Sequence, residues 1–206
     1  RRLMLVLPDD WRPQGVDDLE PGAWQALRET DRSVCVTAGA GAGKTEFLAQ
    51  KAAYLLQTGI CLPPKCILAI SFKRDAAQTL KARVGKRCSP DQARRFHSLT
   101  FDAFTKNMLD RFRAAIPQPF GPPRNYEIGF PRRDDLEDFL TRSGRRDIGW
   151  QKFEKAIARA PLPFDAEGIP PAWRELLHTY WQEQLERPTG TLLSFAMINR
   201  LVDYLL

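Results

Sequence analysis

One stretch near the start of the chain, residues 33–56, limits the fold more than any other. A short β-branched run, Ser33–Thr37, leads into a turn of small residues with the sequence AGAGAGKT, and a segment with helical spacing of its apolar residues follows. Strand, glycine-rich turn and helix in this order are typical of a loop whose backbone N–H groups surround phosphate oxygens at a helix N-terminus. The stretch therefore predicts an α/β fold with a nucleotide-binding site.

The residue types within this loop suit a nucleoside triphosphate. Lys44 supplies a positive charge for the β- and γ-phosphates, and Thr45 offers a hydroxyl to Mg²⁺. The candidate nucleotide-binding residues of the loop are Ala38, Gly39, Ala40, Gly41, Ala42, Gly43, Lys44, Thr45 and Glu46. The other interpretation is a Gly/Ala turn that precedes Lys-Thr by chance, and the strand and helix expected on either side argue against it.

Charge is concentrated in the part of the chain that carries this loop. The net charge is +6, and residues 19–116 alone hold 16 Lys and Arg against 8 Asp and Glu, a local excess of +8. Such an excess is expected where a polyanion binds, although solvated helix faces rich in Lys and Arg produce the same count. No apolar run is long enough to span a membrane, so we expect a soluble, cytoplasmic protein. The four cysteines form no C-x-x-C pair, which favours free thiols over zinc.

Two further strand-to-helix units are expected after the loop. Cys66–Ser71 is a continuous apolar run, typical of a strand buried on both faces of a parallel sheet. It is followed by Phe72, Lys73 and Arg74, an aromatic residue and two cations that could contact a base and a phosphate or could be an ordinary solvated turn. Ala93–His97 reads as another strand, and together these units predict a parallel sheet with helices on both faces.

The second half of the chain has a different pattern. Prolines are frequent from residue 117, and four helices are expected, at about 132–143, 149–159, 171–187 and 191–206. We therefore expect a helical second domain or an insertion into the first.

Four segments together resemble the superfamily 1 DNA helicases of the UvrD, Rep and PcrA type. They are AGAGAGKT (38–45) with Gln25 ahead of it, ILAISFKRDAAQTLKARV (67–84), RFHSLTFDAF (95–104) and TLLSFAMINRLVDYLL (191–206). The resemblance implies an incomplete RecA-like P-loop sheet with an inserted helical subdomain, divided as 1–112, 113–190 and 191–206. It also implies a motor that hydrolyses ATP with Mg²⁺ and steps along single-stranded DNA with the remaining helicase domains of the same protein.

The resemblance assigns roles to individual residues. Lys44 and Thr45 would be catalytic, holding the triphosphate and Mg²⁺, and Gln25 would bind the adenine. The residues expected to contact single-stranded DNA are Phe72, Lys73, Arg74, Phe96 and His97. Glu46 departs from the family, which usually carries Arg there, and Arg95 replaces the usual Thr.

Three hypotheses follow. No Asp-Glu-x-x-Asp segment, which would hold Mg²⁺ and polarise water, occurs in the sequence, so we expect an N-terminal helicase fragment that hydrolyses ATP poorly alone. The alternative is a non-catalytic nucleotide- or DNA-binding module that acts with a partner chain. A small-molecule kinase is disfavoured because we find neither a lid-like arginine cluster nor an acceptor site.

Overall fold

The computed structural model describes residues 5–39, 41 and 43–206. It divides into two compact units, unit 1 (residues 1–101) and unit 2 (residues 102–206), each described here by itself. The α/β class is confirmed in its coarse form, because the described residues form two small parallel sheets within a mostly helical chain. The RecA-like sheet, the inserted subdomain and the division at residues 112 and 190 stay predictions.

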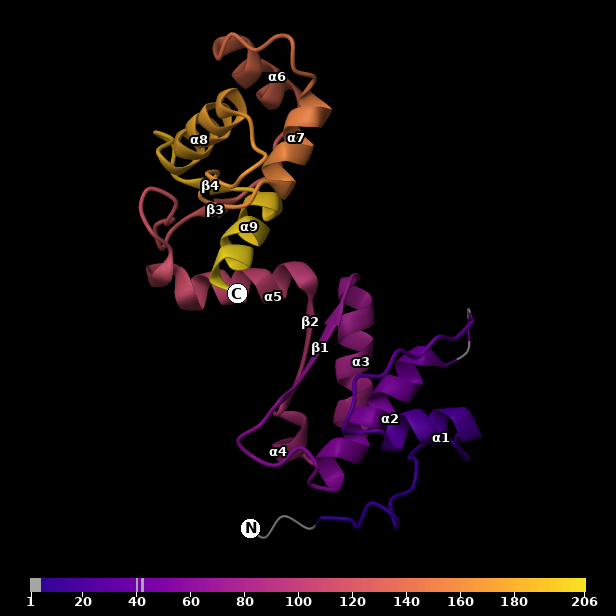
Figure 1. Ribbon diagram of the computed structural model, residues 1–206. Helices are drawn as coiled ribbons and strands as arrows, with labels where there is room; N and C mark the ends of the chain where they lie inside the picture. Colours follow the sequence, from indigo (N-terminus) through magenta and orange to yellow (C-terminus); the bar gives the residue numbers. More distant parts are fainter. Residues whose placement is uncertain (1–4, 40, 42) are drawn as a thin grey trace. The chain divides into compact units, whose positions relative to one another are not determined.

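Unit 1 is built around one parallel strand pair. Its elements are α1 (Pro21–Arg28), α2 (Lys44–Gln57), β1 (Ile67–Ser71), α3 (Arg74–Arg87), α4 (Pro90–Ala93) and β2 (Phe96–Thr100) (Figure 1). In the register of the pair, Ile67 lies opposite Phe96 and Ser71 opposite Thr100. A parallel pair needs a long crossover connection, which α3 and α4 supply here. The strand predicted at Cys66–Ser71 is confirmed, and the one predicted at Ala93–His97 begins three residues later.

Both large helices of unit 1 cover the same face of this sheet. Leu56 of α2 and Val84 of α3 are fully buried, and they share a core with Phe96 of β2. The opposite face carries Leu68 and Ile70, which are 47% and 46% exposed. The prediction of helices on both faces is therefore wrong for unit 1. An apolar run indicates which residues are able to be buried, but its burial depends on neighbours that the run does not specify.

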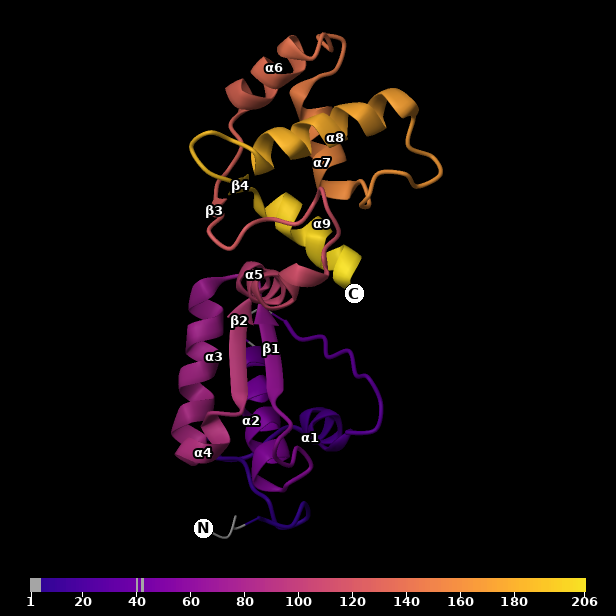
Figure 2. The ribbon, with the colours of Figure 1, turned by 90° about the vertical axis from the view of Figure 1, so that its left-hand side faces the viewer.

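The strand predicted at Ser33–Thr37 is absent. This segment has no regular secondary structure, and in Figure 2 it runs as a coil from α1 toward α2, apart from β1 and β2. Its Val34 and Val36 are 45% and 47% exposed. A strand forms only when a neighbour pairs with it, and among the described residues neither β1 nor β2 takes this segment as a partner. β-branched composition alone is thus insufficient here.

Unit 2 is predominantly helical. Its elements are α5 (Phe101–Phe112), which begins at the unit boundary, the 3₁₀ turn η1 (Arg113–Ala115), β3 (Glu127–Ile128), α6 (Arg133–Arg142), α7 (Trp150–Arg159), α8 (Pro171–Leu185), β4 (Leu192–Leu193) and α9 (Phe195–Leu205). The four helices predicted from residue 132 onward are confirmed within a few residues. The last one begins later than predicted, because Ser194 accepts the N–H of Met197 as its N-cap.

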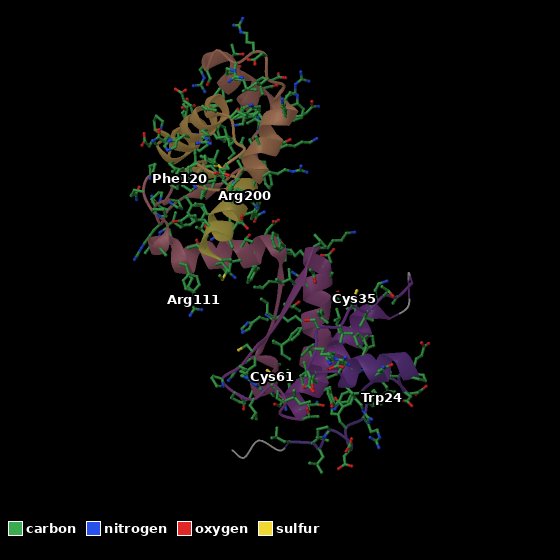
Figure 3. The ribbon with its side chains drawn as sticks, in the orientation of Figure 1. Trp24, Cys35, Cys61, Arg111, Phe120 and Arg200 are labelled. Atoms are coloured by element: carbon green, nitrogen blue, oxygen red, sulfur yellow. The ribbon has the colours of Figure 1, made fainter. Side chains whose placement is uncertain are left out.

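Aromatic packing holds the core of unit 2 together. The rings of Phe139, Phe153 and Tyr180 lie 5.1 to 5.3 Å apart and join α6, α7 and α8. Burial raises the pKa of Tyr180 to about 12. Phe120, labelled in Figure 3, packs edge-on against Phe164. In the described part of the chain, we find no helix with the length and apolar character that a membrane span requires.

Candidate nucleotide-binding site

The glycine-rich loop has the backbone shape that its sequence predicts. Gly41 and Gly43 adopt φ angles of +78° and +71°, in the left-handed region that favours glycine. Gly43 is the N-cap of α2 and accepts the N–H of Phe47 at 2.9 Å through its carbonyl. Gly43 has no side chain that could cap the first N–H groups of this 14-residue helix, so these groups are open to an anion. Ala40 and Ala42, also predicted to bind nucleotide, lie outside the described residues.

Lys44 is exposed at the start of α2 and bends back over the loop. Its Nζ donates hydrogen bonds to the carbonyl oxygens of Ala38 and Gly39, at 2.6 and 2.7 Å. The ammonium group therefore lies within the loop rather than in bulk solvent. Its present partners are neutral carbonyls, and a phosphate oxygen would form a stronger, charge-assisted bond with it.

Beside the loop, unit 1 contains a cavity of about 1140 Å³. Its walls come from residues 16–20, α1, the coil that follows α1, and the first two turns of α2. Lys44 and Gly43 line it, as does Cys35, which Figure 3 labels on the coil before α2. Ligand pockets commonly measure about 300–1,000 Å³, so this volume is sufficient for a nucleoside triphosphate.

Gln25 lies on α1, and its neighbours Gly22 and Ala26 line the cavity. Gln25 itself is exposed and is not among the lining residues. The structure thus brings its helix to the cavity but not its side chain. An adenine contact by Gln25 stays a prediction.

Lys51, which the sequence analysis did not single out, supports one wall of the cavity. Its Nζ donates to the carbonyl oxygens of Leu27 and Glu29, both at 2.6 Å, and to that of Ala26 at 3.2 Å. These carbonyls belong to the C-terminal end of α1, where a cation is favoured by the helix dipole. Burial lowers the pKa of Lys51. The α2 helix thereby holds α1 in position through one side chain.

Glu46 points to α3. Its carboxylate accepts hydrogen bonds from Arg83 at 2.9 Å, Arg87 at 2.7 Å and Gln50 at 2.7 Å. The side chain of Glu46 is 19% exposed and that of Arg87 is 12% exposed, so this contact is largely shielded from water. The negative charge that departs from the family pattern is therefore compensated by two guanidinium groups. The sequence analysis missed these partners because they lie 37 and 41 residues away.

Thr45 offers a hydroxyl next to Lys44. It forms no hydrogen bond that the described part of the chain provides, and it is partly exposed. Mg²⁺ at triphosphate sites usually takes one or two protein ligands and completes its shell with phosphate oxygens and water. The residues present fit that pattern with Thr45 as the protein ligand. No group of three or more His, Cys, Asp or Glu able to hold a metal occurs among the described residues.

The predicted DNA-binding residues divide into two groups. Phe72, 101% exposed, follows β1 directly, and Lys73 and Arg74 begin α3 beside it, exposed as well. His97 is exposed near the start of β2, opposite Leu68. At about 3.3 Å per residue, His97 lies roughly 13 Å along the sheet from Phe72. The structure therefore clusters the first three residues and sets His97 apart.

Phe96 and Arg95 face the protein instead of solvent. Phe96 is 4% exposed and packs under α2 and α3. Arg95 donates to the carbonyl oxygens of Cys61 at 2.6 Å and Lys65 at 3.2 Å. It therefore ties down the loop before β1.

Comparisons with known proteins agree on one group. Residues 19–190 match the family described as the UvrD/REP helicase N-terminal domain. The chain is 35% identical over 104 residues to the ATP-dependent DNA helicase PcrA of Leuconostoc citreum, covering 50% of this chain and 13% of that protein. It is 34% identical over 98 residues to the ATP-dependent DNA helicase Rep of Escherichia coli (strain K12), covering 48% and 14%. With PcrA of Staphylococcus aureus (strain Mu50 / ATCC 700699) it shares 33% identity over 132 residues, covering 63% and 17%.

Proposed function

This chain belongs to the UvrD/REP helicase N-terminal domain family, and we propose that it is the ATP-binding part of a cytoplasmic ATP-dependent DNA helicase. It spans 13% to 17% of the length of the curated relatives it matches. Unwinding and translocation are therefore proposed for the whole protein. For these 206 residues the proposal is binding of ATP with Mg²⁺ and contact with single-stranded DNA.

The observation that carries the proposal is the open start of α2. Two glycines in left-handed conformation bring an uncapped helix N-terminus and Lys44 to the edge of a cavity of about 1140 Å³. We infer that the triphosphate binds there, with Lys44 exchanging the carbonyls of Ala38 and Gly39 for phosphate oxygens. Thr45 would hold Mg²⁺, which supplies charge neutralisation of the β- and γ-phosphates.

The DNA contact is proposed at the end of β1. A fully exposed phenylalanine offers its ring to a base, and the adjacent Lys73 and Arg74 offer charge to the backbone. His97 is the second proposed contact on the sheet. Phe96 is left out of the proposal because its ring is buried.

Binding of a fluorescent ATP analogue tests the nucleotide site. Lys44→Ala removes the charge-assisted bonds to phosphate, each worth about 1.5–3 kcal/mol, so we expect affinity to fall about 10- to 100-fold. Lys65→Ala is the matched control, because Lys65 is exposed in the same unit and does not line this cavity, and it should bind as the parent does. Undiminished binding by a folded Lys44→Ala variant would remove the loop from the mechanism.

A further inference from the structure

A second concentration of cations surrounds the C-terminal end of α5 and the loop after it. These segments enclose a cavity of about 490 Å³. Its charged and polar lining residues are Lys106, Asp110, Arg111, Arg113, Arg124 and Tyr126. All of them lie in unit 2, and none was assigned to nucleotide or DNA from the sequence.

Asp110, the carboxylate of this cavity, is already satisfied. It accepts hydrogen bonds from Lys106 at 2.5 Å and from the hydroxyl of Tyr126 at 2.7 Å. Burial raises the pKa of Asp110, but these two hydrogen bonds outweigh it and leave that pKa below its ordinary value. Burial and the bond to Asp110 raise the pKa of Tyr126, so its hydroxyl stays protonated and continues to donate. Lys106 and Tyr126 thus both hydrogen-bond to the carboxylate of Asp110.

The three arginines of the cavity have no direct carboxylate partner among the described residues, although the charge of Arg113 helps to lower the pKa of Asp110. Within the described part of the chain, Arg111, Arg113 and Arg124 form no ion pair and donate no side-chain hydrogen bond. Arg111 extends from α5 in Figure 3, with its guanidinium 5.6 Å from the ring of Phe112, which is 44% exposed. Like charges gathered around one cavity repel one another, and an anion bound among them relieves that repulsion.

We propose that this arginine cavity (Arg111, Arg113 and Arg124) binds the phosphodiester backbone of single-stranded DNA, as a contact separate from Phe72. Guanidinium groups match phosphate oxygens in pairs of parallel hydrogen bonds. Arginines on two chain segments suit successive phosphates of a strand, and the exposed ring of Phe112 can stack on a base. The inference rests on the proposed function for the choice of DNA as the polyanion.

Fluorescence anisotropy with a labelled oligothymidine, measured at several salt concentrations, tests this proposal. The double variant Arg111→Gln, Arg124→Gln removes two exposed charges. If each contacts one phosphate, the slope of log affinity against log salt becomes shallower by about 1.4 and affinity at low salt falls on the order of tenfold. The control is Arg146→Gln, Arg159→Gln, which removes two exposed arginines of the same unit outside the cavity, and it should retain the parent slope.

Four results would overturn the inference. One is an unchanged salt slope in the cavity variant, and another is an equal change in both double variants, which would indicate overall charge instead of a site. The third is loss of ATP-analogue binding in the cavity variant, which would identify a site for a free nucleotide. A parent chain that binds ATP but no oligothymidine would also end the inference, while leaving the proposed nucleotide site standing.

Discussion

A substitution of Glu46 tests whether this residue stabilises the contact between α2 and α3 or affects nucleotide binding. Its carboxylate joins the first turn of α2 to α3 through Arg83 and Arg87. Glu46→Gln keeps the shape of the side chain but removes its charge and turns one acceptor into a donor. Arg87, 12% exposed, then keeps its bonds to the carbonyls of Gln14 and Arg83 and loses its anionic partner.

The magnitude follows from these contacts. A hydrogen bond to a charged group contributes about 1.5–3 kcal/mol, and this range applies to the shielded bond from Arg87. The bond from Arg83 adds little, because Arg83 is 41% exposed and solvent screens it. We therefore expect Glu46→Gln to lower the free energy of opening of α2 and α3 by about 2 kcal/mol. That corresponds to about 30-fold faster amide exchange in their interiors.

Hydrogen–deuterium exchange mass spectrometry measures this effect separately for each helix. Asp91→Asn is the control, because the ion pair of Asp91 with Arg94 is long, at 3.4 Å, and the two side chains are 70% and 80% exposed. Loss of this ion pair should change amide exchange in α2 by less than about twofold. Since Glu46 is already compensated, we also expect ATP-analogue affinity of Glu46→Gln to stay within about threefold of the parent. Unchanged exchange in α2, or nucleotide binding tightened tenfold, would refute the view that Glu46 serves α3 instead of opposing phosphate.

Two further predictions concern DNA and thiol chemistry. Phe72→Ala should weaken oligothymidine binding about 5- to 150-fold, since stacking of one base contributes about 1–3 kcal/mol. The control Phe130→Ala removes a ring that is 76% exposed in unit 2, and it should leave the affinity unchanged. Equal affinities of the two variants in anisotropy titrations would contradict the stacking role of Phe72. Burial raises the pKa of Cys88 to about 11, so the reactive thiolate forms only as the pH rises toward that value. At pH 8 iodoacetamide should therefore label exposed Cys35 and Cys66 well before Cys88, and peptide mapping that finds equal rates would disprove this.

The sequence predicted most reliably those features that depend on local spacing. The helices of unit 2 follow from apolar residues at helical intervals and from prolines between them, and the structure begins and ends them within a few residues of the prediction. The turn of the glycine-rich loop is also local, because glycine tolerates the left-handed backbone that Gly41 and Gly43 adopt. β1 was found because the short length of its apolar run and the turn residues before it favour a strand over a helix.

The errors share one physical cause, which is dependence on distant partners. Ser33–Thr37 has strand composition, yet a strand is stabilised by a paired neighbour, and no described residue pairs with it. Leu68 and Ile70 are apolar, yet both large helices of unit 1 pack on the other face. Phe96 was expected to contact DNA, yet α2 and α3 pack over its ring. In each case the residue type was interpreted correctly and the neighbour was unknown.

The same dependence explains why the sequence predicted the residue types of the candidate site but not the contacts of Glu46 with α3. Lys44, Thr45 and the glycines lie within eight consecutive residues, so their spacing alone was enough to predict a phosphate-binding role for them. Glu46 is adjacent to them, and the sequence analysis placed it among the candidate nucleotide-binding residues although the family usually carries Arg there. Its bonds to Arg83 and Arg87 could not be foreseen from local spacing, and through them a compensated carboxylate joins α2 to α3, which follows the proposed DNA contact Phe72.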